Sequence, residues 1–224
     1  MGKTLVFDSS TLISLSETCS TAALGFLKKR SGVRLAAPQA VYEESVGTPS
    51  RTHKFGFSAL RIKRLFSNGV IEVPAGDLRQ ETDAILQECN SLLAVGGRPL
   101  KLIHEGEAAC IALLQKTGAQ HLAIDEKTLR LMVESPKKMR KLLQAEYSQP
   151  IEENTAALKQ WEAKTKGVRI IRSAEILATA AQEGFFRQFG ADEQDAWHAA
   201  AYALRNAGCS LSSRELAAFA QIRA

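Results

Sequence analysis

Short apolar runs alternate with longer helical stretches along most of the chain, and this alternation constrains the fold more than any other feature. Five runs of four residues are too short for helices and are bounded by Asp, Pro or Gly, as buried strands are. They cover residues 4–7, 33–36, 70–73, 121–124 and 168–171. Strands that alternate with helices usually pair in parallel, with helices on both faces. The sequence therefore predicts an α/β fold, a five-stranded mostly parallel sheet sandwiched by helices.

The stretches between these runs carry helical periodicity or helix-capping residues. We expect a helix over 11–30 that breaks near Ser16, and one over 127–146 that breaks at Pro136. Residues 48–66 form a polar, basic connection, with a helix expected from Ser58. The remaining helices are expected at 39–46, 78–95, 105–116, 152–166, 173–183, 191–206 and 212–222.

The composition is typical of one globular domain over residues 1–224. Hydrophobic residues make up 45% of the 224 residues, which is enough for a sizeable core. No apolar run approaches the roughly 18 residues of a membrane span, and Asp8 interrupts the first apolar stretch too early for a signal peptide. The cysteines are widely spaced and form no metal-ligand pair, so we expect free thiols and a cytoplasmic protein without membrane contact: Cys19, Cys89, Cys110 and Cys209.

Basic residues concentrate in two segments, although the net charge is only +5. Residues 51–64 contain no acid, and residues 127–172 carry 11 basic against 5 acidic residues. The rest of the chain is acidic. Basic segments on an acidic body favour binding of a polyanion, because each phosphate contact releases counterions. A solvated helix face is the alternative. The candidate nucleic-acid-binding residues are Arg51, Lys54, Arg61, Lys63, Arg64, Lys137, Lys138, Arg140 and Lys141.

Four acids are expected near the carboxyl edge of the sheet. Asp8 and Asp125 directly follow predicted strands, Glu107 lies in the first turn of a predicted helix, and Glu44 lies on the helix after the second strand. Carboxylates that converge repel one another unless a cation lies between them, and an oxygen-only ligand set favours Mg²⁺ or Mn²⁺. Such a site is suited to phosphodiester hydrolysis. Taken singly, Asp8, Glu107 and Asp125 could instead cap helices, and Glu44 could simply face solvent.

Glu43 and Glu44 are adjacent on the helix expected over 39–46, so only one of them can face the metal. On a helix, Glu44 shares a face with Ala40 and Val41, whereas Glu43 lies toward the flank. Because an acid on a buried face needs a compensating cation or hydrogen bonds, we expect Glu44 to be the ligand.

Four segments also carry a family resemblance. Residues 6–13 resemble the opening of a PIN domain, where a strand ends in Asp followed by small hydroxyl residues and an apolar helix start. Residues 41–46 are similar to the second motif of that family, residues 106–113 to its Gly-Glu-Ala helix start, and residues 122–127 to an apolar strand ending in two acids. Residues 171–184 are similar to its closing strand and helix. The motifs stand in the family's order and spacing.

The resemblance implies a flavodoxin-like five-stranded parallel sheet and a Mg²⁺- or Mn²⁺-dependent endoribonuclease. Carried over to this chain, Asp8, Glu44, Glu107 and Asp125 are the metal ligands and catalytic acids. Supporting residues are Ser10, whose hydroxyl steadies the site, Glu43, the competing acid of the second motif, and Glu126, which matches the second acid of the fourth motif.

Two basic segments depart from compact members of the family and are interpreted as insertions, at 49–69 and 133–166. Within the second, Trp161 and Tyr147 either stack on bases or anchor the insertion to the body, and we favour anchoring. The family's further acid is missing after Glu126, which favours one cation over two. The alternatives to a ribonuclease are a catalytically weak nucleic-acid-binding or complex-scaffolding protein and a structure-specific DNA nuclease. RNA or DNA, a second copy of the chain, and an inhibitor or complex partner protein are the partners compatible with these functions.

Overall fold

A four-stranded parallel sheet forms the centre of the protein. The structure, a computed structural model, describes residues 3–51 and 53–222, leaving out the side chains of residues 51, 53, 54 and 220. The strand order is β2-β1-β5-β7, and every neighbouring pair is parallel. The strands are β1 (Thr4–Phe7), β2 (Arg34–Ala36), β5 (His121–Ala123) and β7 (Arg169–Ile171). The predicted α/β class and parallel sheet are therefore confirmed.

The segment predicted as the third strand, residues 70–73, is not a full strand. It makes a single parallel bridge from Glu72 to Ala36 at the outer edge of β2. Glu72 donates its N–H to the Leu35 carbonyl at 2.9 Å and accepts the N–H of Ala37 at 3.0 Å. The pairing stops there because Pro74 has no N–H to continue a ladder.

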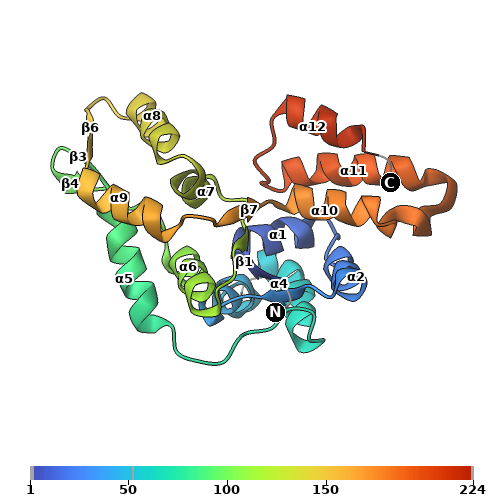
Figure 1. The fold of residues 1–224 in the computed structure, drawn as a ribbon. Helices are drawn as coiled ribbons and strands as arrows, with labels where there is room; N and C mark the ends of the chain where they lie inside the picture. Colours follow the sequence, from blue (N-terminus) through green and yellow to red (C-terminus); the bar gives the residue numbers. More distant parts are fainter. Residues whose placement is uncertain (1–2, 52, 223–224) are drawn as a thin grey trace.

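Helices cover both faces of the central sheet. Val6 and Phe7 point to opposite faces of β1, and both side chains are fully buried. The flanking elements are α1 (Ser9–Glu17), α2 (Ala22–Ser31), α3 (Gln39–Tyr42), the π-helix η1 (Glu43–Gly47), the 3₁₀ helix η2 (Pro49–Arg51), α4 (His53–Ser67), α6 (Glu105–Thr117), α7 (Lys127–Glu134), α10 (Ser173–Gln182), the 3₁₀ helix η3 (Phe185–Asp192), α11 (Glu193–Asn206) and α12 (Ser213–Ala220). Figure 1 shows α10, α11 and α12 together on one side of the molecule.

Several helix boundaries around the central sheet differ from the sequence prediction. The break predicted near Ser16 lies just after α1, where Cys19 adopts a positive φ of 57°. The helix expected from Ser58 already begins at His53. The helix expected over 39–46 continues as a π-helix from Glu43, which changes the direction of the side chains there.

A second, antiparallel sheet lies away from the first, on the left of Figure 1. Its order is β4-β3-β6, formed by β3 (Leu93–Val95), β4 (Arg98–Pro99) and β6 (Ile151–Glu153). The predicted helix over 78–95 thus ends early, as α5 (Arg79–Asn90). Gly96 and Gly97 both have positive φ, 55° and 74°, as a two-residue hairpin turn requires. The helix expected over 152–166 is α9 (Thr155–Lys164), because residues 152 and 153 belong to β6.

The segment 133–166 is held to the body by a buried tryptophan. It contains α8 (Pro136–Glu146), which begins at the predicted Pro136 break, together with β6 and α9. Trp161 is fully buried and donates its indole N–H to the Met132 carbonyl at 2.9 Å, whereas Tyr147 is 41% exposed. Trp161 therefore anchors the segment. The single domain over 1–224 and the insertions at 49–69 and 133–166 stay predictions.

All four cysteines are free thiols. Among the helices that the structure describes, none has both the length and the apolar character to cross a membrane.

Candidate functional site

Asp8 caps α1 with one carboxylate oxygen and leaves the other without a partner. It directly follows β1, and its N–H is held by the Ala123 carbonyl of β5 at 2.9 Å. Oδ2 accepts the N–H of Ser10 at 2.9 Å and its hydroxyl at 2.6 Å. Oδ1 is buried with no hydrogen-bond partner. The capping role considered from the sequence is thus real, but it uses only half of the carboxylate.

At the start of α6, Glu107 likewise uses one carboxylate oxygen as a helix cap and leaves the other without a partner. Its Oε2 accepts the N–H of His104 at 2.8 Å, in a capping box at the helix N-terminus. Its Oε1 is buried with no partner. An unpaired buried carboxylate oxygen is costly, so two of them at one edge of a sheet need an explanation.

The electrostatics show that these carboxylates crowd one another. Burial, with a contribution from the charge of Glu44, raises the pKa of Asp8 to about 6. Burial and then the charge of Asp8 raise the pKa of Glu107 well above its usual range, and Glu126 adds to this shift. Burial and like charge therefore disfavour the charged forms of both carboxyls. A cation between the carboxylates would instead lower both pKa values.

Ser10 ties the end of β1 to the end of β5. While its hydroxyl donates to Asp8, it also accepts the N–H groups of Asp125 at 3.0 Å and Glu126 at 3.2 Å. One donor and two acceptor positions are all a serine hydroxyl offers, so Ser10 is saturated. It therefore fixes the Asp8 carboxylate relative to the chain at Asp125 and Glu126.

Glu44 lies beside the Asp8–Glu107 pair but on the surface. The expectation that it shares a buried face is wrong: Glu44 is exposed, and the buried residues of η1 are Ser45 and Val46. The π-turn beginning at Glu43 causes this difference. The Glu44 carboxylate nevertheless lies against α6, because a Cβ added to Gly106 would collide with its Oε2.

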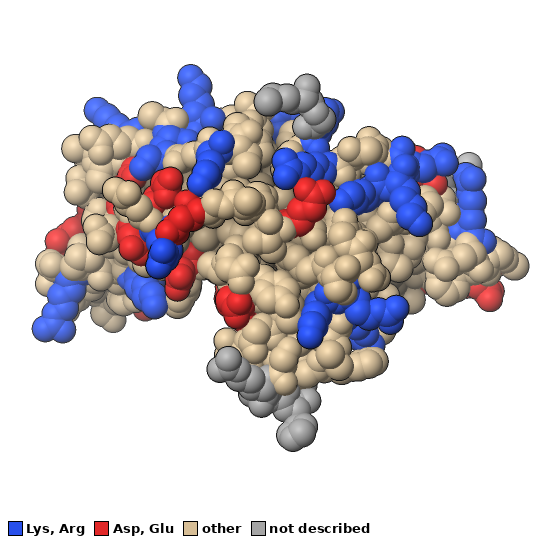
Figure 2. Space-filling view, turned by 90° about the horizontal axis from the view of Figure 1, so that it is seen from below, with Lys and Arg blue, Asp and Glu red and all other residues tan. Residues whose placement is uncertain are grey.

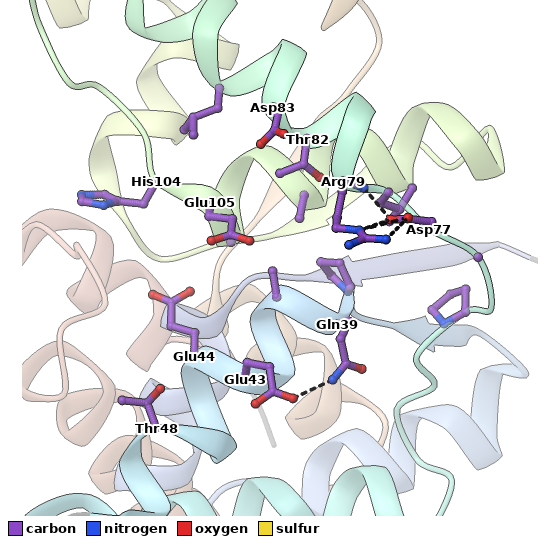
Figure 3. Close-up of a pocket in the computed structure, with 18 of the residues that line it drawn as sticks. Gln39, Glu43, Glu44, Thr48, Asp77, Arg79, Thr82, Asp83, His104 and Glu105 are labelled. Atoms are coloured by element: carbon purple, nitrogen blue, oxygen red, sulfur yellow. Dashed lines mark hydrogen bonds and ion pairs between the residues drawn. The ribbon is translucent and has the colours of Figure 1, made fainter.

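Glu43 is turned to another partner. Its Oε1 accepts the side-chain N–H of Gln39 at 2.7 Å, and the side chain lies along its own helix over Gly47. Figure 3 shows this contact, with Glu44 directed instead toward the first turn of α6. Of the two adjacent acids, only Glu44 contributes to the pKa shift of Asp8.

The Asp125 carboxylate is hydrogen-bonded to the start of α10. Both of its oxygens are taken by Ser173, one by the N–H and one by the hydroxyl, each at 2.7 Å. Asp125 is thus buried against the first turn of α10. Sequence reasoning assigned no role to Ser173, and its only signal was a small hydroxyl residue two positions after the last strand.

Glu126 is partly committed as well. Its Oε2 caps α7 by accepting the N–H groups of Thr128 at 2.5 Å and Leu129 at 3.0 Å. Its carboxyl also lies near that of Glu107, and its charge, together with the hydrogen bond that the two groups share when one is protonated, raises the pKa of Glu107. Asp8, Glu107, Glu44 and Glu126 therefore form one electrostatically coupled group.

This donor set fits a hard divalent cation. Within residues 3–51 and 53–222, no three His, Cys, Asp or Glu side chains already form a ready-made metal-ligand group. The two unpaired oxygens of Asp8 and Glu107 are nevertheless the atoms that Mg²⁺ or Mn²⁺ would take, because these ions prefer carboxylate oxygens.

An acidic groove opens beside this group. It has a volume of about 1110 Å³ and lies between α3 and η1 on one side and α5 and the start of α6 on the other. Glu44 and Glu105 point into it from opposite walls, and an Asp77–Arg79 ion pair lies farther along (Figure 3). The groove was not predicted from the sequence, because its walls come from three separate segments.

The candidate nucleic-acid-binding residues have different environments. Arg61 donates to the Ser16 carbonyl at 2.8 Å, and Arg140 pairs with Glu153 at 3.5 Å. Five others are exposed: Lys63, Arg64, Lys137, Lys138 and Lys141. The side chains of Arg51 and Lys54 lie outside the described part. Figure 2 shows most Asp and Glu of one face gathered on its left half, with Lys and Arg among them, whereas the charged side chains of the right half are mainly Lys and Arg.

No protein-family model, curated protein or solved structure matches this chain significantly. The function is therefore argued from the site alone.

Proposed function

We propose that the protein is a PIN-like, Mg²⁺- or Mn²⁺-dependent nuclease that hydrolyses RNA phosphodiesters. One observation carries this proposal: Asp8 and Glu107 each hold one oxygen by helix capping and leave the other buried without a partner. Both oxygens belong to residues at the carboxyl edge of a parallel sheet, where open α/β folds bind ligands. A divalent cation would compensate the burial and the repulsion between carboxylates, which together raise both pKa values.

The residues of the site divide into ligands and positioning residues. Asp8 and Glu107 would hold the metal, with Glu44 at its exposed side. Ser10 fixes Asp8, and the His104 N–H fixes Glu107. When bound, the metal supplies polarisation of a phosphoryl oxygen and a lowered pKa of a coordinated water. Glu44, as the only exposed acid of the three, is the group that meets substrate.

A fifth parallel position extends the central sheet. The bridge at Glu72 puts residues 70–73 outside β2, so the five positions run in the order residues 70–73, β2, β1, β5 and β7. Numbered along the chain this order is 3-2-1-4-5, so the expected flavodoxin-like order, 2-1-3-4-5, is wrong. The chain differs at Asp125, whose oxygens are both held by Ser173. One cation, held by Asp8, Glu107 and Glu44, is the arrangement that fits these residues.

A cleavage assay tests the proposal. The purified protein is incubated with single-stranded and duplex RNA and DNA of equal length, and with branched and flapped DNA, in Mn²⁺, in Mg²⁺ and in EDTA. We expect metal-dependent cleavage of RNA that Asp8→Asn abolishes. Cleavage restricted to branched or flapped DNA supports the structure-specific DNA nuclease instead. Cleavage that persists in EDTA contradicts the metal assignment.

A second candidate function follows from Asp125. Because each of its oxygens accepts a hydrogen bond from Ser173, Asp125 has no wholly unpaired oxygen for a cation, in contrast to Asp8 and Glu107. This favours a catalytically weak protein that binds nucleic acid or scaffolds a complex. RNA binding in Mn²⁺, with cleavage no faster than in EDTA, is the result that selects it.

A further inference from the structure

An exposed stripe of mixed apolar and basic side chains runs along α4. Phe57, Leu60, Arg61 and Arg64 stand at positions i, i+3, i+4 and i+7, so they share one face of the helix. Phe57 is 68% exposed and Leu60 is 55% exposed. We call these four residues the α4 stripe. Large apolar side chains at such exposure, in a row on one helix, indicate a contact surface.

The helix that carries the α4 stripe is held to the body of the protein by buried side chains and by hydrogen bonds to Ser16. Its opposite face is buried through Ala59, Ile62 and Leu65. The hydroxyl of Ser16, near the end of α1, donates to the Ser58 carbonyl at 3.0 Å. Arg61 in turn donates to the Ser16 carbonyl at 2.8 Å. The stripe is therefore preorganised on a rigid element.

One face of the Phe57 ring is already covered by a cation. The guanidinium carbon of Arg61 lies 4.0 Å from the ring centroid. Arg61 is held there by Ser16, so the ring is stacked from one side, while its high exposure leaves apolar area for another planar group. A phenyl ring backed by a guanidinium is a good surface for a nucleobase, because both stack on π-faces.

The charge around the ring suits a phosphate backbone. Residues 45–71 contain no Asp or Glu. Lys63 and Arg64 are exposed, and neither takes part in an ion pair with any residue that the structure describes. The helix that carries the stripe packs against η1, the element that carries Glu44.

From these contacts we infer that the α4 stripe binds single-stranded RNA, with an unpaired base stacked on Phe57 and the flanking phosphates on Lys63 and Arg64. This inference rests on the proposed function, which supplies nucleic acid as the substrate. It adds a preference for unpaired strands, because a base in a duplex has no free face to offer. The acid-free surroundings favour a polyanion over a protein partner.

Binding without cleavage tests this inference separately from catalysis. A fluorescein-labelled single-stranded RNA and the same sequence in a duplex are titrated in EDTA by anisotropy, with every variant in an Asp8→Asn background. Loss of one stacked base costs about 5- to 150-fold in affinity, so Phe57→Ala should weaken single-strand binding by that factor. Phe57→Leu should weaken single-strand binding almost as much, whereas Phe57→Trp, which keeps an aromatic ring, should bind the single strand as well as the protein with Phe57. Duplex binding should change little.

Matched variants separate stacking from charge and from general exposure. Phe189→Ala removes another exposed phenyl ring, 50% exposed on η3, and should leave binding unchanged. Phe57→Ala should leave the salt dependence as it is, whereas Arg64→Ala should lower the log–log slope by about 0.7.

The results divide cleanly. If the parent protein binds RNA and Phe57→Ala binds equally well, the stacking inference is overturned and the proposed function is not affected. Equal losses on duplex and single strand also overturn it. If Phe57→Ala changes only self-association in sedimentation velocity, the stripe is a protein interface. If the parent protein binds no RNA, this inference and the proposed substrate both fail.

Discussion

At the scale of single residues, the carboxylates of this site have two uses. Asp8, Glu107 and Glu126 each cap a helix with one oxygen, which explains why each looks like an ordinary capping residue in the sequence. What distinguishes Asp8 and Glu107 is the second oxygen, buried without a partner. A substitution that keeps the cap but removes the charge therefore separates the two uses.

Asp8→Asn is that substitution. Asn is also a good N-cap, so its carbonyl oxygen can still accept from Ser10. We expect loss of metal-dependent cleavage, and a melting temperature in EDTA no lower than that of the parent protein, because a buried repulsive charge is gone. Thermal denaturation and the cleavage assay check both parts. A clear drop in melting temperature would show that the cap is the main role, and cleavage at the parent rate would remove Asp8 from the site.

The two adjacent glutamates are distinguished in the same way. The Glu44 carboxylate faces Gly106, and its charge contributes to the raised pKa of Asp8, whereas Glu43 accepts a hydrogen bond from Gln39. Glu44→Gln should lose most activity in Mg²⁺, and Glu43→Gln should keep most of it. A side-by-side cleavage time course decides the matter. The reverse ranking would move the site one residue back along η1.

Gly106 gives a prediction that does not depend on turnover. A Cβ at this position would collide with the Glu44 carboxylate, which is the mobile end of an exposed side chain and can move away. Gly106→Ala should therefore keep or raise stability by roughly 0.5–1 kcal/mol, as Gly-to-Ala changes in helices do, while weakening Mn²⁺ binding.

Calorimetric titration of Mn²⁺ measures this effect. Gly56→Ala is the matched control, because it lies on α4 and a Cβ there meets nothing within 4 Å. It should raise stability and leave Mn²⁺ affinity unchanged. Equal Mn²⁺ affinity in the Gly106→Ala and Gly56→Ala variants would show that the position of Glu44 against α6 does not matter for Mn²⁺ binding.

At the scale of elements, the sequence predicts what local patterns determine. Four of the five predicted strands form the central sheet, because short apolar runs bounded by turn residues are buried strands in almost any α/β context. The hairpin of β3 and β4 was missed, since β3 also pairs with β6, more than fifty residues away. The π-turn at Glu43 and the Asp125–Ser173 bonds likewise depend on tertiary packing, and only the structure reveals them.

Helix α8 carries the prediction at this scale. Lys137, Lys138 and Lys141 are exposed, whereas Arg140 already pairs with Glu153. Replacing all four by Gln should weaken RNA binding at low salt and lower the log–log salt slope by about 0.7 for every phosphate that is no longer neutralised. Anisotropy titrations over a range of salt measure the slope, with Arg140→Gln alone as the control of small effect. An unchanged slope would make α8 a solvated or protein-binding face.

At the scale of the whole molecule, the stability of the metal-free protein should depend on pH in a way that reveals the site. The folded state raises the pKa of Asp8 from 3.8 to about 6 and that of Glu107 above its usual range. Between the ordinary and the raised pKa, the folded protein holds a proton that the unfolded chain has released. Stability contributed by these groups is therefore present at low pH and is lost as the pH rises through the folded-state pKa values, by at most about 1.4 kcal/mol per pH unit for one proton.

The decisive quantity is a difference between two proteins, because groups elsewhere act in the opposite direction. Glu215, for example, has its pKa lowered to about 2 by Ser212 and Arg172, so its contribution is lost as the pH falls. In EDTA, the melting temperature of Asp8→Asn minus that of the parent should grow between pH 4 and 7. Added Mn²⁺ should shrink or reverse this difference, because only the parent protein gains stability by binding the ion. If this difference in melting temperature does not change with pH or with Mn²⁺, Asp8 is neither a carboxyl group with a raised pKa nor a metal ligand.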